Sequence, residues 1–332
     1  MKPVGLVAIE AEMARQGADA LASYISAGAA ADDAAASIRR TGRLAMLAMG
    51  DSDSVNRMVE PLYRDLGIDA VALPVSEQLT SPLPLGDRTV LLASQSGESA
   101  EVVRWLATAR EGEAFGLTLD GASTFRRAVP SLVAEGGPEL AFAGTRSLTL
   151  TLALHLAILA RLGHNAGRAL AFLPDLPESD VTPALEALAA VRAVVTSGRK
   201  LQGVAEACAL GLCELSRAPA FALEGSQLRH GPMEIMGPDL GVVLFAGDEE
   251  AAVLVLGMAR SAAKAGARVV LLDASGAAPI PDVVSVSLQR ATGMAAVLAS
   301  LPTMQRLMLG FAAARVADVG TPCRSSKITR DE

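Results

Sequence analysis

The segment from Ser94 to Ser99 reads Ser-Gln-Ser-Gly-Glu-Ser and has the residue types of a phosphate-binding loop. It follows an apolar, β-branched run (Thr89 to Ala93) and precedes an amphipathic run (Ala100 to Arg110), which predicts a strand, a loop and a helix in that order. A helix N-terminus attracts anions through unpaired N–H groups and its dipole, and serine hydroxyls and a flexible glycine add to such a cradle. The segment contains no Lys or Arg, so recognition would depend on dipoles and hydrogen bonds. The alternative is a capping loop, in which Ser96 or Ser99 caps the helix.

Glu214 and His230 are the candidates for acid–base chemistry. Glu214 lies in an apolar stretch, so its carboxylate must be paired, protonated or functional, unless it is only a charge at a helix end. His230 lies in the sequence Arg-His-Gly-Pro, which predicts a turn, and an ordinary surface histidine is the alternative. A carboxylate can move a proton between carbon atoms, and an imidazole can exchange protons with a ring oxygen near neutral pH. His155 lies in mid-helix among leucines, where core packing is expected.

Length and composition limit the class of protein. A chain of 332 residues that is 51% hydrophobic predicts two domains and a sizeable core. The net charge of -7 argues against nucleic acid as a partner, but it allows an anionic small molecule. The three cysteines are too few and too scattered for a disulfide framework or a zinc site, and they fit a reducing cytoplasm. No signal-peptide pattern is present and the apolar run from Leu148 to Leu162 is too short to span a membrane, so a cytoplasmic protein without membrane contact is expected.

Strand and helix patterns alternate along the chain, which predicts parallel sheets with helices on both faces. The chain begins with two expected helices, from Glu10 to about Ala31 and from there to Arg40. In the first half, strands are expected at residues 44–48, 70–73, 89–93, 115–119 and 132–134, and helices at 53–66, 100–110 and 145–162. Residues 167–183 have the composition of a linker. Beyond it, strands are expected at 193–196, 242–246 and 268–272. Helices are expected at 201–215 and 302–319, and a further helix follows the strand at 242–246 and its loop and reaches Ala265.

The second half therefore repeats the first, but the two halves differ at one loop. The counterpart of the Ser94 to Ser99 segment reads Gly-Asp-Glu-Glu from Gly247 to Glu250. Three carboxylates at a helix start satisfy the dipole and repel a phosphate. A duplicated unit with a phosphate site in its first half only is the expectation.

Four separated motifs make the chain resemble the double sugar isomerase (SIS) domain family, and within it the isomerase half of glucosamine-6-phosphate synthase. The family reads Ser-Gln-Ser-Gly-Glu-Thr at residues 94–99 and Glu-Leu-Lys-His-Gly-Pro at residues 227–232, where this chain has Gln-Leu-Arg-His-Gly-Pro. It reads Ala-Gly-x-Glu-Ile-Gly-Val-Ala-Ser-Thr-Lys where this chain runs from Gly136 to Arg146, and its C-terminal Lys matches Lys327. The resemblance covers nearly the whole chain. It implies an α/β fold with two tandem flavodoxin-like SIS domains, each a parallel sheet flanked by helices.

The resemblance also implies the domain boundaries. N-terminal helices would occupy residues 1–37, and the first SIS domain, with the phosphate-binding loop, residues 38–165. A linker at 166–190 would lead to the second SIS domain at 191–319. The C-terminal tail at 320–332 would fold over the site.

By the same resemblance, each matching residue has an expected role. Glu214 would be the base that moves a proton between C1 and C2, and His230 would open the sugar ring from the neighbouring subunit, which implies a homodimer. Lys327 would lie at the carbonyl carbon, where the family's Lys can form a Schiff base, although a polar tail would otherwise be expected to be disordered. Neither a cofactor nor a metal is expected. The expected binding residues for a sugar phosphate are Ser52, Ser94, Gln95, Ser96 and Ser99, together with Glu139, which matches a family site carboxylate.

Two departures from the family bear on the reaction. Gly211 replaces a family Lys three residues before the base, which could widen the site for another substituent. The chain begins Met-Lys-Pro and lacks the glutaminase domain of the synthase, so synthase activity is not expected. The favoured function is a deaminase that converts glucosamine 6-phosphate to fructose 6-phosphate and ammonia. The alternatives are a phosphosugar isomerase or deglycase with another substrate, and a non-catalytic sugar-phosphate sensor, although the chain has no DNA-binding segment.

Overall fold

The computed structural model describes residues 2–108 and 112–330, and the chain forms two compact units. We call the first the N-terminal unit, which consists of Glu10–Pro174 together with Pro322–Glu332. The second, the C-terminal unit, consists of Asp175–Thr321 together with Met1–Ile9. Residues 322–330 therefore fold with the N-terminal unit.

The sheet of the N-terminal unit is parallel, with the strand order β2-β1-β3-β4-β5. This is the flavodoxin-like order, in which the chain changes direction between β1 and β3. The central strand β3 is apolar and buried along its whole length, as expected for a strand covered on both faces. The strands are β1 (Arg43–Ala48), β2 (Asp69–Pro74), β3 (Thr89–Ala93), β4 (Ala114–Thr118) and β5 (Ser131–Val133).

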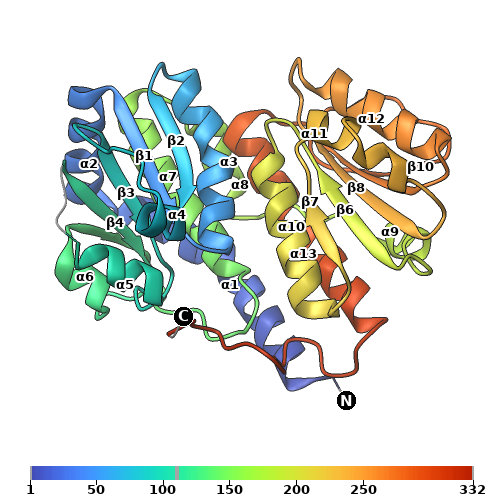
Figure 1. Ribbon diagram of the computed structural model, residues 1–332, viewed down its shortest axis with the longest axis horizontal. Coiled ribbons are helices and arrows are strands. Elements are labelled where there is room, and N and C mark those ends of the chain that lie inside the picture. The colour runs from blue at the N-terminus through green and yellow to red at the C-terminus, as the bar shows by residue number, and fades with distance from the viewer. Residues whose placement is uncertain (1, 109–111, 331–332) are drawn as a thin grey trace. The chain divides into compact units, whose positions relative to one another are not determined.

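Helices cover this sheet on both sides (Figure 1). Three of them, α4, α5 and α6, supply side chains such as Trp105 and Phe125 to a buried cluster on the sheet. The helices α2 and α3 both pack against α7 and against β1 and β3. The helices are α1 (Val4–Ser26), α2 (Gly28–Thr41), α3 (Asp51–Asp65), α4 (Val75–Thr80), α5 (Ala100–Leu106), α6 (Thr124–Ala128), α7 (Arg146–Leu162) and α8 (Gly167–Phe172).

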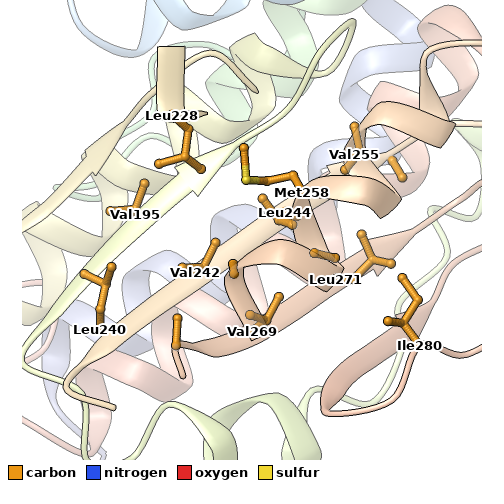
Figure 2. Close-up of a cluster of buried hydrophobic side chains, with 14 residues drawn as sticks. Val195, Leu228, Leu240, Val242, Leu244, Val255, Met258, Val269, Leu271 and Ile280 are labelled. Carbon is orange, nitrogen blue, oxygen red and sulfur yellow. The ribbon is translucent and has the colours of Figure 1, made fainter. Parts of the chain in front are cut away.

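The parallel sheet of the C-terminal unit has the order β10-β9-β8-β6-β7, which is the same order as in the first sheet when its strands are counted along the chain. Figure 2 shows the core on one face, where Val242 and Leu244 of β8 pack with Val255 and Met258 of α12. The strands are β6 (Ala193–Ser197), β7 (Ala220–Ala222), β8 (Leu240–Ala246), β9 (Arg268–Asp273) and β10 (Val283–Ser287).

On the other face of this sheet, α10 packs against α13. Among the described residues, α13 alone is long and apolar enough to span a membrane by length and composition, and 89% of its apolar window is buried, as in the core helix of a folded domain. The helices of the unit are α9 (Thr182–Ala187), α10 (Gln202–Ser216), α11 (Gly225–Arg229), the short η1 (Pro232–Ile235), α12 (Ala252–Lys264) and α13 (Gly293–Ala313).

The expectation of parallel α/β sheets flanked by helices is confirmed, but several local predictions were wrong. The last helix was predicted to begin at Pro302, whereas Pro302 is a buried interior residue of α13. The expected linker at residues 166–190 contains the two short helices α8 and α9. The strands β7 and β10 were missed because both are partly exposed edge strands, so neither forms a buried apolar run. Residues 109 and 110 of the predicted helix after the serine loop lie outside the described residues.

Candidate functional site

The serine loop, residues Ser94–Ser99, follows β3 at the carboxyl edge of the first sheet. The loop after the neighbouring strand β1 leads into α3, whose first turn contains Ser52. In open α/β sheets, ligands bind outside the carboxyl ends of the strands at the point where the strand order reverses. Here that point lies between β1 and β3, so the fold brings both predicted phosphate-binding segments to the expected edge of the sheet.

Hydrogen bonds within the serine loop orient its hydroxyls. The Oγ of Ser94 accepts from the backbone N–H of Gly97 (3.1 Å), and the Oγ of Ser96 accepts from that of Glu98 (3.2 Å). A hydroxyl that accepts a hydrogen bond still has its own O–H to donate. Both serines can therefore donate to a phosphate oxygen. Gly97 has a φ of 65°, and a Cβ there would lie 2.4 Å from the Oγ of Ser123, so the loop requires a glycine.

The capping alternative is not what the described residues show. Ser99 stands at the N-cap position of α5, but its side chain makes no capping hydrogen bond to the described part of the helix. The carboxylate of Glu98 instead accepts from the backbone N–H of Thr124 (2.6 Å), at the start of α6. The loop serines thus leave the N-terminus of α5 to another partner.

That partner is the C-terminal tail, which we define as Pro322–Arg330 within the described residues. The backbone N–H of Ala100, the first residue of α5, donates to the carbonyl of Thr329 (3.0 Å). The tail runs beside α5 in Figure 1, where it is red. Two residues earlier, the Nζ of Lys327 lies 3.1 Å from the Oε2 of Glu139. The tail therefore docks on the N-terminal unit beside the serine loop and brings a cation that the loop itself lacks.

Glu139 is a buried carboxylate with many donors around it. Its side chain is 0% exposed. It accepts hydrogen bonds from the backbone N–H and hydroxyl of Thr145 (both 3.0 Å) and from the hydroxyl of Ser147 (2.7 Å), besides the ion pair with Lys327. Burial by itself raises the pKa of Glu139, but the charge of Lys327 and these hydrogen bonds outweigh burial, so the pKa is lower than that of an ordinary glutamate. Glu139 is therefore an anion that holds the tail lysine.

Two further contacts link the segment around Glu139 to the serine loop and to the start of α3. The Nε2 of Gln95 in the serine loop donates to the carbonyl of Glu139 (3.3 Å). On the other side, Gly144 approaches the first turn of α3 so closely that a Cβ on Gly144 would lie 2.1 Å from the Oδ2 of Asp51. The structure thus brings Gln95, Glu139 and Lys327 together, with Ser52 one residue from the Asp51 contact.

The other two predicted catalytic residues belong to the C-terminal unit. Glu214 is half-buried near the end of α10. His230 is exposed at the end of α11, where its backbone N–H donates to the carbonyl of Gln227 (3.2 Å). Their roles, and the supply of His230 across a dimer interface, stay predictions. His155 is fully buried, as expected for a core residue, and burial lowers its pKa to about 3.

The structure gives no support for a site widened at Gly211. A Cβ at this buried position would lie 2.5 Å from the Cε of Met308 and 2.8 Å from its Sδ. Met308 of α13 therefore fills the space beside Gly211, and this glycine allows α10 and α13 to approach closely.

At the carboxyl edge of the second sheet, charged side chains in the loops form ion pairs. In the loop after β8, Asp248 accepts two hydrogen bonds from the guanidinium of Arg290 (2.7 and 2.9 Å). In the loop after β6, the guanidinium of Arg199 donates to Glu224 (2.9 Å). Among the described residues, no group of three or more His, Cys, Asp or Glu side chains is placed to hold a metal ion.

The sequence analysis gave no role to three residues around Glu139. Thr145 and Ser147 donate to the carboxylate, and Arg146 between them is fully buried in contact with α1. A signal was available, because Thr-Arg-Ser at the start of an apolar helix places two hydroxyls within a few residues of a glutamate. The partners of Arg146 on α1 lie more than 120 residues away along the chain, so only the fold reveals them.

Comparison with known proteins supports this view of the fold. No model of a known protein family matches the chain. The chain is 29% identical over 286 residues to the glutamine–fructose-6-phosphate aminotransferase (isomerizing) of Rhizobium leguminosarum bv. viciae, a match that covers 74% of this chain and 45% of the relative. The chain thus spans less than half the length of this curated relative.

Solved structures match over nearly the whole chain. The C-terminal domain of glucosamine-fructose-6-phosphate aminotransferase from Francisella tularensis has a TM-score of 0.80 at 18% identity and covers 94% of this chain and 97% of its own. The tagatose-6-phosphate ketose/aldose isomerase of Escherichia coli has a TM-score of 0.75 at 19% identity (97% and 98% covered). The glucosamine-6-phosphate deaminase of Thermotoga maritima has a TM-score of 0.69 at 18% identity (93% and 99% covered).

At such identities the structures establish the fold, and the sequence match establishes common descent with part of the aminotransferases. The chain is therefore related to part of glutamine–fructose-6-phosphate aminotransferase, and it shares its fold with the C-terminal domain of such an enzyme and with a tagatose-6-phosphate ketose/aldose isomerase.

Proposed function

We propose that the protein is a phosphosugar isomerase-type enzyme that converts glucosamine 6-phosphate and water to fructose 6-phosphate and ammonia. The observation that carries this proposal is the arrangement around the serine loop. Its oriented hydroxyls lie at the switch point of the sheet, and the tail beside them contributes Lys327, paired with the buried Glu139. Dianion binding at such a loop fixes one end of a sugar phosphate, so the other end is presented to catalytic groups in a defined position.

The phosphate would be bound by the hydroxyls of Ser94, Ser96 and Ser99, with Ser52 adding a donor from α3. Loop N–H groups already occupy acceptor positions on Ser94 and Ser96, and the O–H groups of these two serines would donate to the ligand. Hydroxyl and amide donors bind a dianion without a formal countercharge in the loop itself. Lys327, brought by the tail, would supply positive charge near the carbonyl end of the opened sugar.

The chemical step follows from the resemblance of Glu214 and His230 to family residues. His230 would protonate the ring oxygen and open the ring. Glu214 would then take the proton from C2 and return it to C1, while one proton passes from the amino nitrogen to O1, which leaves a hydroxyl group at C1 and an imine at C2. Water adds to this imine and ammonia leaves, which yields the ketone of fructose 6-phosphate. The overall reaction involves no net oxidation or reduction, so these reaction steps need no cofactor.

The test is to incubate the protein with glucosamine 6-phosphate and to measure ammonia and fructose 6-phosphate in parallel. Equal amounts of both products are expected. In the Glu214→Gln variant, kcat should fall by about 10²- to 10⁴-fold, the usual contribution of a general base, while the variant still binds the sugar phosphate. A Glu214→Gln rate within about tenfold of wild type would rule out Glu214 as the base.

Glu206 offers a matched control, because it lies on the same helix and its Oε1 accepts a hydrogen bond from Gln202 (3.2 Å). Glu206→Gln removes a carboxylate from α10 in the same way. It is expected to leave kcat unchanged, which separates the loss of a base from a general disturbance of the helix.

A second candidate is an aldose–ketose isomerase that does not release ammonia. Gly211 favours it, because the family's second amine is absent and Met308 occupies the adjacent space. The similar tagatose-6-phosphate isomerase structure is consistent with this reaction class. Turnover of neutral sugar phosphates with no ammonia from any amino sugar would favour the isomerase, and phosphosugar binding without any turnover would favour a sensor.

A further inference from the structure

Helix α1 carries a stripe of polar side chains, which we call the α1 stripe: Glu12, Arg15, Gln16, Asp19 and Ser23. Spacings of three and four residues place them on one face of the helix. They belong to the N-terminal unit.

Each member of the α1 stripe contacts the segment that surrounds Glu139, which runs from residue 135 to residue 149. The backbone N–H of Leu140 donates to Glu12 (3.0 Å), and the guanidinium of Arg15 donates to the carbonyl of Gly136. At the two ends of the segment, Ser23 accepts from the N–H of Glu135 (2.9 Å) and Thr149 is 2.9 Å from Gln16. Asp19 binds Arg146 (3.1 Å). Helix α1 is therefore hydrogen-bonded to this segment on both sides of Glu139.

Arg146 is the centre of this arrangement. Its side chain is 0% exposed. Its Nε lies 2.6 Å from Glu12, one terminal nitrogen lies 3.1 Å from Asp19, and the other donates to the carbonyl of Gly137 (2.8 Å). All three guanidinium nitrogens are thus used, two on α1 and one on the loop. A buried guanidinium held by two carboxylates has few alternative positions, because leaving either partner exposes an unpaired buried charge.

The position of Arg146 in the chain connects this network to the proposed site. Its neighbours Thr145 and Ser147 are the residues that donate to the carboxylate of Glu139, and the loop carbonyl it binds is two residues before Glu139. Whatever fixes Arg146 therefore fixes the donors and the backbone on which the Glu139 carboxylate depends.

We propose that Arg146, held by Glu12 and Asp19 of α1, is a positioning residue that fixes the carboxylate of Glu139 and through it the ammonium of Lys327. Arg146 contacts no part of the proposed ligand. Its catalytic consequence rests on the proposed function, but the placement of Lys327 can be measured without any substrate.

Lysine acylation provides that measurement. The chain has four lysines, Lys2, Lys200, Lys264 and Lys327. The exposed Lys200 and Lys264 serve as internal references during reaction with N-hydroxysuccinimidyl acetate, followed by mass spectrometry. An amine paired with a buried carboxylate reacts slowly. In Arg146→Met, the acylation rate of Lys327 relative to both references should rise about tenfold, the size expected for loss of a hydrogen bond to a charged group.

The controls come from the same helix and the same network. Arg161→Met removes another α7 arginine, which bonds to Asp32 and to the carbonyl of Gly28, and should leave the Lys327 rate unchanged. Arg146→Lys keeps the charge and should restore most of the protection. Glu12→Gln keeps an acceptor for Leu140 and provides a milder variant if Arg146→Met does not fold.

The proposal is overturned if folded Arg146→Met or Glu12→Gln leaves Lys327 within about twofold of wild type while Glu139→Gln exposes it, because Glu139 would then be held without the network. In an active enzyme, Arg146→Met should lower kcat and leave KM nearly unchanged, since the serine loop is intact. If the wild type turns over no sugar phosphate but the acylation pattern appears as expected, the proposed function fails and the positioning role stands.

Discussion

The loop after β3 and the loop after β8 follow the corresponding strands of two sheets with the same strand order, yet their side chains differ in kind. The first loop, Ser94–Ser99, has three hydroxyls and one carboxylate, and that carboxylate is directed to the start of α6. The second, Gly247–Glu250, has three carboxylates. One of them, Asp248, is paired with Arg290.

This difference shows how one topology can serve two purposes. At the second sheet, Asp248 with Arg290 and Arg199 with Glu224 form charge pairs within the chain, so a dianion would have to displace an existing partner. At the first sheet, the loop contains no cation, and the nearby positive charge comes from the far end of the chain through Lys327. We infer that the first edge is built for a ligand and the second for stability.

The largest effect is expected when a carboxylate, as found in the loop after β8, is introduced into the serine loop. Ser96→Asp keeps an oxygen that can accept from the N–H of Glu98, but it adds a negative charge where the phosphate would bind. Two unit charges about 4 Å apart repel by about 1 kcal/mol in water and about 4 kcal/mol near a protein surface, so affinity for glucosamine 6-phosphate should fall by between about fivefold and about 700-fold in isothermal titration.

The neutral variant Ser96→Asn is the matched control for shape, and its affinity should fall much less. Asp248→Asn in the second loop should leave affinity unchanged. Equal affinities for Ser96→Asp and Ser96→Asn would show that no anion binds at the serine loop.

A smaller effect is expected on the stability of the N-terminal unit as the pH changes, through the ion pair between Glu139 and the C-terminal tail. The pKa of Glu139 is lower in the folded chain than its ordinary value of 4.5, so its stabilising contribution is complete above pH 4.5 and is lost as the pH falls through the lowered value. The destabilisation caused by Glu139→Gln should therefore be full near neutral pH and shrink in acid.

The measurement is urea unfolding at several pH values, followed by the fluorescence of Trp105, the single tryptophan, which is 3% exposed on α5. The Lys327→Met background is the control, since the double-mutant cycle isolates the ion pair. A Glu139→Gln effect that does not shrink at any acid pH at which the protein is still folded would contradict a charged Glu139 as the anchor of the tail.

Local patterns were sufficient for much of this fold. The apolar run of β3 was predicted with its observed bounds, Thr89–Ala93, because a fully buried parallel strand has no polar interruption. The serine loop was identified because hydroxyls and a glycine follow that strand directly. The start of the last helix was predicted incorrectly, because a proline such as Pro302 is usually found at the start of a helix. In the structure Pro302 lies inside α13, which packs against α10.

The remaining features depend on contacts between distant residues. Nothing near Lys327 in sequence indicates an ordered tail, and its partner Glu139 lies 188 residues away. Arg146 and Glu12 are 134 residues apart, and their ion pair becomes apparent only when α1 is packed against α7. The closed space beside Gly211 likewise depends on Met308 of another helix.

The central claim, that the serine loop of the first sheet binds the phosphate of a sugar phosphate, is tested most directly by a crystal structure of the protein soaked with glucosamine 6-phosphate. The expected result is a phosphate group within hydrogen-bond distance of the hydroxyls of Ser94, Ser96 and Ser99, with the loop from Gly247 to Glu250 empty. A phosphate bound elsewhere, with these hydroxyls bonded only within their own loop, would contradict it.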